Sequence, residues 1–302
     1  MYFAVDDFQI AALQAEIRST MQAGHIDANW YALVDLAFDH ERGNPLRWPH
    51  ASEPVYRTAG MDAVSPTLLR LSLPASDAAR MDLARLLRHC DGRPMLSFVH
   101  TELGMKALAD AWQAITKVQA EDGQTFLLRF ADTRVQGTLP GSLGSQSWQR
   151  LCRPLRAWYT IDRAARWQAL PMPEPAPTGQ GSIDPLGAQE PFCIDAQAFA
   201  RMLDAAQPDV LIDAMSEQLP GVLPARHRAQ VHALVTRACE LACAHHLESL
   251  DDQLPLALLA CVSDGALLRH PALPDLLAAY QPGAGTLSDS LMALLPATEG
   301  PA

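Results

Sequence analysis

The pattern of hydrophobic and polar positions divides the chain into two regions with different periods. In the first region, short apolar runs alternate with segments of helical spacing. The runs that predict strands are 30–36, 67–73, 95–99, 126–130 and 157–161. The segments that predict helices are 8–21, behind a cap at Asp6 or Asp7, 78–90, behind a cap at Ser76, and 103–118 and 145–151. This alternation predicts an α/β or α+β lobe, with a mixed sheet flanked by helices.

A run of prolines and glycines at residues 171–191 interrupts the pattern and predicts an extended linker. Beyond the linker only helical spacing remains. The predicted helices are 195–206, 208–218, 224–250, 254–263, 274–280 and 287–295. We therefore expect an α/β domain in residues 1–170, the linker in 171–191 and an all-α lobe in 192–302.

The stretch from Phe126 to Leu139 brings an apolar run, several charges and a short helix together. The run 126–130 predicts a strand covered on both faces, with Arg129 as its only charge. Asp132 is placed to cap the helix that begins at the next residue, and its carboxylate is within reach of Arg129. Arg134 opposes the helix dipole, so we expect it to point outward to an acidic partner, in this chain or another.

Motifs in and around this stretch resemble the signature of a known adaptor and chaperone family. They are Arg129-Phe130-Ala131-Asp132-Thr133-Arg134, Leu139-Pro140, Leu155-Arg156-Ala157-Trp158, Trp30-Tyr31-Ala32-Leu33-Val34-Asp35 and Met95-Leu96-Ser97-Phe98. Together they are similar to the family called Tap or Tec, which is encoded beside the VgrG spike proteins of type VI secretion systems. The similarity covers roughly residues 25–165. Ala131 and Thr133 replace an aromatic residue and a proline of the signature, so we expect a less rigid corner here.

The resemblance implies a non-enzymatic chaperone that binds a toxic effector protein in the cytoplasm and loads it onto the VgrG spike. It implies the effector and VgrG as partners, and no cofactor. We expect Arg129, Asp132 and Arg134 to organise the N-terminal lobe, and Arg134 to be the first of them to touch a partner. Trp48, in a proline-bearing loop, and Trp167, before the linker, are candidates for an exposed binding surface.

Composition and charge narrow the classes of partner. The 302 residues are 49% hydrophobic and 19% charged, as in a globular protein that buries a core. Residues 1–170 hold 18 Lys and Arg against 18 Asp and Glu, whereas residues 171–302 hold 5 against 16, so the net charge of −11 is C-terminal. Such an acidic lobe disfavours nucleic acid and either favours a basic protein surface or serves solubility alone.

The sequence shows no apolar run of about 18 residues for a membrane span. Its first residues also lack the pattern of a signal peptide. We therefore expect a cytoplasmic protein that does not bind a membrane and whose six cysteines are reduced.

Two groups of residues keep other functions open. Asp35, His100 and Asp132 fall near predicted strand ends, where a His flanked by carboxylates would serve as the general base of an enzyme, unless they only cap helices and close hydrogen bonds. Cys239, Cys243 and His246 share a face of one predicted helix, as metal ligands or, as their apolar neighbours favour, as a packed stripe. A further alternative is an immunity-type inhibitor whose acidic lobe fills a basic toxin site.

Overall fold

The computed structural model describes residues 2–23, 28–39, 45–58, 60–61, 64–72, 76–174, 192–281 and 286–295. The chain folds as two compact units. The N-terminal unit holds Asp7–Leu203, and the C-terminal unit holds Met1–Asp6 together with Asp204–Ala302. The division falls inside helix α7 (Ala196–Gln218). Residues 175–191 of the predicted linker lie outside the described residues, so the domain boundaries drawn from the sequence stay predictions.

A six-stranded sheet forms the centre of the N-terminal unit. In spatial order its strands are β2 (Ser52–Pro54), β3 (Pro66–Arg70), β1 (Asn29–Asp35), β4 (Leu96–Thr101), β7 (Ala157–Ile161) and β8 (Trp167–Ala169). Every neighbouring pair in this sheet is antiparallel. β1 and β4 are buried almost throughout, as expected for strands with continuous apolar sequences that are covered on both faces.

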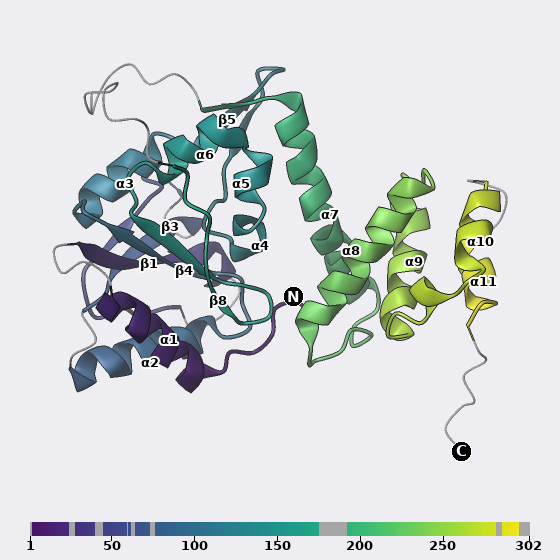
Figure 1. The fold of residues 1–302 in the computed structure, drawn as a ribbon, viewed down its shortest axis with the longest axis horizontal. Helices are drawn as coiled ribbons and strands as arrows, with labels where there is room; N and C mark the ends of the chain where they lie inside the picture. Colours follow the sequence, from purple (N-terminus) through teal and green to yellow (C-terminus); the bar gives the residue numbers. More distant parts are fainter. Residues whose placement is uncertain are drawn as a thin grey trace. The chain divides into compact units, whose positions relative to one another are not determined.

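Helices cover the two faces of this sheet. Figure 1 shows α1 (Ile10–Ala23) and α2 (Asp77–Cys90) on one side, and α3 (Met105–Gln113) on the other. The short helices on the side of α3 are α4 (Thr133–Gln136), α5 (Leu139–Ser142) and α6 (Gly144–Cys152). α2 begins as predicted, because the hydroxyl of Ser76 accepts the N–H of Ala79.

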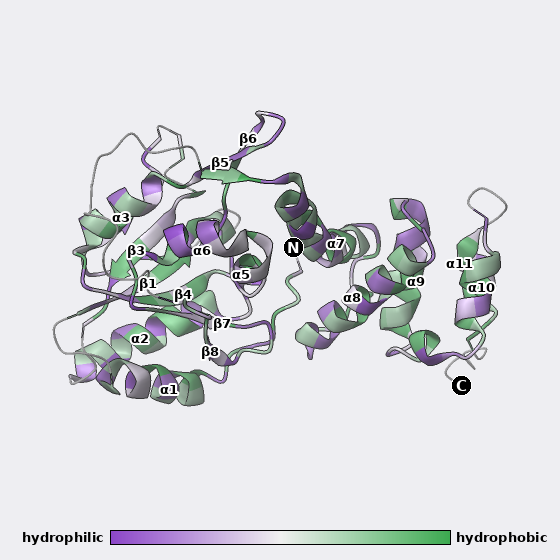
Figure 2. Cartoon of the chain, turned by 45° about the horizontal axis from the view of Figure 1, so that its top comes forward, coloured by the Kyte–Doolittle hydropathy of each residue, from purple (hydrophilic) through white to green (hydrophobic). Residues whose placement is uncertain are grey.

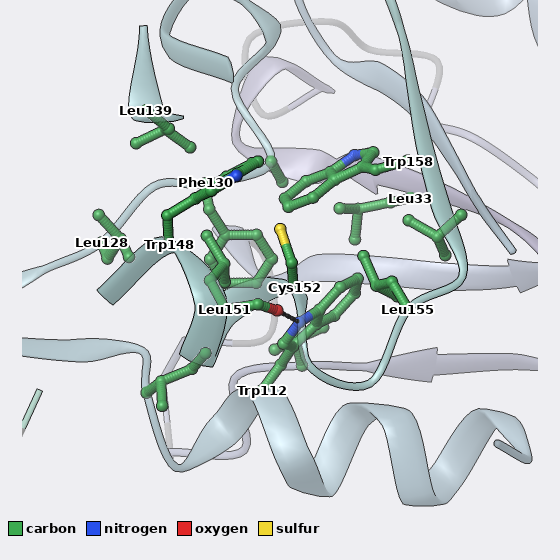
Figure 3. Packing of buried hydrophobic residues seen from close by; sticks show 14 of the residues in the cluster. Leu33, Trp112, Leu128, Phe130, Leu139, Trp148, Leu151, Cys152, Leu155 and Trp158 are labelled. Carbon is green, nitrogen blue, oxygen red and sulfur yellow. Dashed lines mark hydrogen bonds between the residues drawn. The ribbon is translucent and has the colours of Figure 1, made fainter. Parts of the chain in front are cut away.

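The core between the sheet and α3 is built around Trp158 of β7, which is fully buried. Its ring centroid lies 5.8 Å from that of Trp112, 6.1 Å from that of Phe130 and 6.0 Å from that of Trp148. Figure 3 shows these rings together with the surrounding aliphatic side chains. The indole N–H of Trp112 donates to the carbonyl of Leu151 at 3.1 Å, so the polar atom of this large side chain is satisfied.

A second, three-stranded sheet has the order β6 (Thr125–Leu127), β5 (Lys117–Ala120) and β9 (Phe192–Ile194). β5 pairs with β6 antiparallel and with β9 parallel, so the mixed character of the unit lies here. The predicted helix over 103–118 ends at Gln113, because the residues from Lys117 onward join this sheet.

The predicted strand 126–130 is only partly correct. The strand ends at Leu127, and its side chains are exposed rather than covered on both faces, with Phe126 at 36% and Leu127 at 39%. Leu128 and Phe130 are buried, but they follow the strand as the chain turns into the core. The apolar run therefore serves two structures in succession, an edge strand and a core segment.

The described part of the C-terminal unit is helical. After α7 come α8 (Arg228–Ala244), α9 (Leu250–Val262), the short 3-10 helix η3 (Leu267–Arg269), α10 (Leu273–Ala279) and α11 (Leu287–Met292). The two helices predicted on either side of Pro208 are one helix, α7. Burial of Leu211, Ile212 and Met215 after the proline outweighs the loss of its N–H donor.

The first residues of the chain pack into the C-terminal unit. Ala4 is buried in its core, and the hydroxyl of Tyr2 donates to the carbonyl of Pro224 at 2.9 Å. The carboxylate of Asp6 accepts the N–H of Ala229 at 3.1 Å, in the first turn of α8. Asp6 therefore caps α8 rather than the first helix of the chain, so this alternative of the predicted cap is wrong, while Asp7 stays a prediction.

The fold class expected from the sequence is confirmed, with sheets and flanking helices in the N-terminal unit and helices in the C-terminal one. Figure 2 shows β1 and β4 of the six-stranded sheet as mainly hydrophobic and the β5–β6 turn as hydrophilic. None of the helices within the described ranges has the length and hydropathy that a membrane crossing requires.

Candidate functional site

The segment between β6 and α4 joins a group of linked charges in the N-terminal unit, and the two carboxylates of this group are buried. We call this group the charged corner and define it as Asp35, Phe38, Arg129, Asp132 and Arg134. The backbone places it, because Leu128 and Phe130 enter the core and leave the residue between them at the surface. The side chain of Arg129 is 43% exposed. The corner therefore joins one surface cation to groups that lie beneath it.

Arg129 links two buried carboxylates. Its Nη2 donates to Oδ2 of Asp35 at 2.9 Å and lies 3.8 Å from Oδ2 of Asp132. The backbone N–H of Ala37 also donates to Asp35, at 3.1 Å. Burial raises the pKa of Asp35, and the charge and hydrogen bond of Arg129 offset this only in part. Arg129 thus stabilises the ionised form of the carboxylate at the end of β1.

Asp132 caps α4, as predicted, and also binds Arg134. Its Oδ1 accepts the backbone N–H of Arg134 at 3.0 Å, and its Oδ2 accepts Nη2 of the same residue at 2.8 Å. Arg134 Nε lies 3.1 Å from Oδ1, so the guanidinium grips the carboxylate with two nitrogens. The acidic partner expected for Arg134 is therefore in this chain, and the Arg134 side chain is only 16% exposed.

Phe38 lies under both arginines. It belongs to the 3-10 helix η1 (Leu36–Asp39), which directly follows β1. The guanidinium carbon of Arg129 is 5.1 Å from the centroid of its ring, and that of Arg134 is 5.2 Å away. Both contacts have the geometry of cation–π interactions. Sequence periodicity did not single out Phe38, because its role depends on a contact across some ninety residues, a separation comparable to that of Asp35 and Arg129.

A second group of buried charges lies beside the corner. Arg93 Nη1 donates to Oδ1 of Asp39 at 2.6 Å, His89 Nε2 is 2.8 Å from the same oxygen, and the N–H of Leu46 donates to Oδ2 at 2.9 Å. Arg93 also donates to the carbonyl of Phe38 at 3.2 Å. Burial raises the pKa of Asp39, but the hydrogen bonds from His89, Leu46 and Arg93 outweigh it and hold the pKa at about 2.

Acidification is expected to remove about 2 kcal/mol of stability through Asp39. Because its pKa in the folded state is about 2, below the ordinary value, ionised Asp39 stabilises the fold above about pH 4. That contribution is lost as the pH falls through about 2. Denaturant unfolding of the wild type and of Asp39→Asn across this range should show their difference shrinking as the pH falls.

The wild type must be compared with Asp39→Asn because Asp35 changes stability with pH in the opposite direction to Asp39. Its pKa is raised, so its contribution to stability is greatest at low pH and declines as the pH rises through its folded value. This contribution cancels when the variant is subtracted from the wild type. A difference between the two that stays constant over the range would contradict the role given to Asp39.

The structure separates His100 from the carboxylates that the sequence grouped with it. β1 and β4 are antiparallel, and His100 lies opposite Trp30, five residues along the strand from Asp35. At the usual rise per residue this is a separation of roughly 16 Å, and the odd number of steps puts Asp35 on the other face of the sheet. The His100 ring instead stacks on Trp30, with centroids 4.6 Å apart. Of the three predicted residues, Asp35 and Asp132 therefore meet at Arg129, whereas His100 does not join them, because the antiparallel strands β1 and β4 end at opposite edges of the sheet.

Trp48 and Trp167 are both half-buried. The indole N–H of Trp48 donates to the carbonyl of Arg70 at 3.2 Å. Trp48 lines a pocket that also includes Met21, Leu71 and Leu83 and the paired side chains of His50 and Asp82, which are 2.7 Å apart. The Trp167 ring stacks on Tyr159 at 4.9 Å, and its N–H donates to Thr20 at 3.0 Å. Trp48 therefore stays a candidate for a binding surface, while Trp167 has extensive contacts within its own unit.

The cysteines of α8 differ in their surroundings. Cys239 is half-buried, and burial raises the pKa of its thiol to about 11, whereas Cys243 is exposed. Within the residues that the structure describes, no three His, Cys, Asp or Glu side chains gather as a metal site would require. Cys239 lies partly in the core of the C-terminal unit, as the packed-stripe interpretation expects, but Cys243 and His246 are exposed. α8 ends at Ala244, so His246 lies beyond the helix and the prediction that all three residues share one helix face is wrong.

Comparison with known proteins gives one match. Residues 30–150 match the family model described as "Domain of unknown function (DUF4123)". No curated protein matches the chain. No solved structure matches it either. The matched span begins in β1 and ends in α6, so it contains the whole charged corner and Asp39 with its partners.

Proposed function

We propose that the chain is a non-enzymatic adaptor and chaperone, which binds a type VI secretion effector and loads it onto the VgrG spike. The DUF4123 family is known as the effector-associated chaperone and adaptor type of these systems, and the match over residues 30–150 supports the proposal. The observation that carries it is that motifs from distant parts of this span meet in one place. Asp35, the last residue of the motif 30–35, binds Arg129, the first residue of the motif 129–134, across 94 residues.

The charged corner is suited to protein binding because its surface cation is already ordered. The two carboxylates and the ring of Phe38 fix the Arg129 side chain, so a partner that contacts it loses little further side-chain entropy. Both ion pairs of Arg129 are made by Nη2. A guanidinium carries further N–H donors in a planar fork, which suits a carboxylate or backbone carbonyls of the effector. Because the Arg129 side chain is more exposed than the Arg134 side chain, we expect Arg129 to be the residue that contacts the effector.

Co-expression tests the proposal directly. The chain is produced with a candidate effector toxin and a VgrG protein from a type VI secretion gene cluster. We expect a higher soluble yield of the toxin and recovery of all three proteins in one complex, because a chaperone binds the segments that would otherwise aggregate. If the toxin's yield is unchanged and no complex with VgrG forms, the adaptor role is wrong.

Two arginine substitutions, one in the charged corner and one outside it, test where the toxin binds. Arg129→Gln keeps a hydrogen-bond donor for Asp35 but removes the cation, and we expect toxin binding to weaken by about tenfold. Arg156→Gln is the matched control. Arg156 is also exposed and paired with one acid, Glu102, but it lies beside His100 at the other end of the sheet. Calorimetry should show that the control binds the toxin as tightly as the wild type does. If both variants lose the same affinity for the toxin, or if neither loses any, the charged corner is excluded as the contact.

An immunity-type inhibitor is the second candidate, because residues 171–302 hold 16 acidic side chains against 5 basic ones. Such an inhibitor would offer a negative surface to a basic toxin site. The same experiment separates the two functions. An inhibitor protects a target cell from the toxin without binding VgrG, whereas an adaptor requires that contact.

A further inference from the structure

The outer edge of β6 has backbone groups that are free to pair with another strand. Leu128 N–H donates to Thr116 O at 2.8 Å, and Ala120 N–H donates to Gln124 O at 2.9 Å. In an antiparallel pair the residues alternate in the side they present, so Thr125 and Leu127 direct their N–H and C=O groups away from β5. Among the described residues β6 is the last strand of its sheet. The edge therefore offers two donors and two acceptors to a further strand.

This edge lacks the charges and the proline that often protect an exposed strand. β2, an edge strand of the six-stranded sheet, has the charged residue Glu53 and ends at Pro54, which cannot donate to a neighbour. β6 has neither a charge nor a proline, and it presents Phe126 and Leu127. The β5–β6 hairpin stands out from the body of its unit in Figure 2. An unprotected apolar edge is the feature that strand-addition sites share.

An apolar surface continues from this edge onto α7. The ring of Phe126 lies 5.0 Å from that of Phe199, between centroids. Leu203 follows Phe199 by one helical turn on the same face of α7, and it is 56% exposed. A strand beside β6 can therefore bury an apolar side chain against Phe126 and these two residues of the same unit. Contiguous exposed apolar residues of this kind indicate a protein contact.

Charges are distributed unequally along the edge. Glu121 and Asp122 lie in the turn at one end of β6, and both are exposed. At the other end Lys117 is opposite Leu127 and is exposed as well. Arg129 of the charged corner lies two residues beyond the strand. A strand that pairs with β6 would thus be favoured if it had a basic residue near the turn and an acidic residue near Lys117.

A second copy of the chain fits this edge less well than a flexible segment. β6 has three residues, about 10 Å of strand, and beyond it the chain turns into the core at Leu128. Two such edges form at most about four hydrogen bonds before they diverge, and they bury far less than the ~1,200 Å² of a stable interface. An unstructured segment is not limited in this way, because it can bend to follow the apolar surface of α7.

We propose that the outer edge of β6 binds an extended segment of the effector, which joins the three-stranded sheet as a fourth strand. The segment carries an apolar residue beside Phe126, a basic residue beside the turn and an acidic residue beside Lys117. This inference rests on the proposed function, since its occupant is the effector. It adds a mode of recognition, by backbone pairing, that connects directly to the charged corner through the residues after Leu127.

A proline substitution tests the backbone pairing. Leu127→Pro removes an N–H that points outward while leaving the bonds to β5 in place, and the preceding residue is already extended, as proline requires. Leu127→Ala is the matched control, because it removes the same side chain and keeps the N–H. Overlapping short peptides that cover the toxin sequence serve as probes, with binding measured by fluorescence anisotropy. We expect one peptide to bind, and Leu127→Pro to weaken its binding about tenfold relative to Leu127→Ala.

The outcomes are distinguishable from failure of the proposed function. If the intact toxin binds and both variants bind it equally well, the adaptor role stands and the β6 edge is excluded. If the toxin and its peptides do not bind the wild type, both proposals are wrong. Circular dichroism and thermal unfolding establish that the variants fold; if Leu127→Pro does not, Lys117→Glu replaces it, and binding must then be restored by reversing the acidic residue of the peptide. A concentration-dependent dimer that Leu127→Pro abolishes would assign the edge to a second copy instead.

Discussion

Replacing Asp132 by alanine is expected to lower the free energy of unfolding of the N-terminal unit by about 3 kcal/mol. The carboxylate is 3% exposed and holds two arginines, and it also accepts the first free N–H of α4. Removing one member of a buried ion pair leaves the other charge without compensation. Arg134 retains some contact with water, which places the expected loss at the lower end of the range for buried pairs.

Asp132→Asn separates the two roles of this residue. Asparagine is as good an N-cap as aspartate, so this variant keeps the hydrogen bond to the helix and loses only the charge. Chemical denaturation of both variants at neutral pH provides the measurement. We expect the asparagine variant to lose less stability than the alanine variant, by about 1 kcal/mol. Equal stability of the wild type and both variants would show that the charged corner does not stabilise the fold.

Trp158→Ala is expected to cost about 4 kcal/mol, the largest effect of a single core substitution in this unit. The side chain is fully buried and contacts three other aromatic rings, so its removal leaves a cavity that rigid neighbours cannot fill. Its N–H also donates to the hydroxyl of Ser97 at 3.2 Å, and that hydroxyl in turn accepts the amide of Gln136 at 3.0 Å. Figure 3 shows the Trp158 ring beside its aromatic and aliphatic neighbours.

Trp158→Phe provides the control for this prediction. Phenylalanine retains most of the apolar contact and removes the hydrogen bond, so we expect about half the loss. Thermal and denaturant unfolding of the two variants, followed by near-ultraviolet circular dichroism, measures the difference. An alanine variant within about 1 kcal/mol of the wild type would mean that the core is not organised around this residue.

The sequence was most informative where local chemistry decides the structure. The buried strand that ends at Asp35, the cap of α2 at Ser76 and the cap of α4 at Asp132 all follow from neighbouring residues, and the structure confirms them. Hydrophobic periodicity and capping act over a few residues, and so they can be inferred from one chain. Beyond the proline-rich segment the helical spacing likewise predicts helices, but β9 (Phe192–Ile194) was missed, because it is a strand only through its pairing with β5.

Predictions that needed the tertiary arrangement were less successful. His100 was grouped with Asp35 by a rule for parallel strands, but the strands that carry them are antiparallel. Arg134 was expected to point outward because of the helix dipole, yet the capping carboxylate two residues earlier attracts it more strongly. The exposure of Phe126 could not be predicted from the apolar residues around it in the sequence. It depends on the position of β6 at the edge of its sheet, beside β5.

The packing of Tyr2–Asp6 into the C-terminal unit has a consequence for dissecting the protein. The chain passes from one unit to the other after Asp6 and again after Leu203. A cut after Asp6 therefore leaves the two units covalently joined, and a cut after Leu203 separates residues 1–6 from the rest of the C-terminal unit. A helical fragment that starts after the proline-rich segment would expose the surface that Ala4 covers and lose the cap that Asp6 supplies to α8. Such a fragment should regain stability when a peptide with the sequence of residues 2–6 is added, as in a protein reassembled from two complementary pieces.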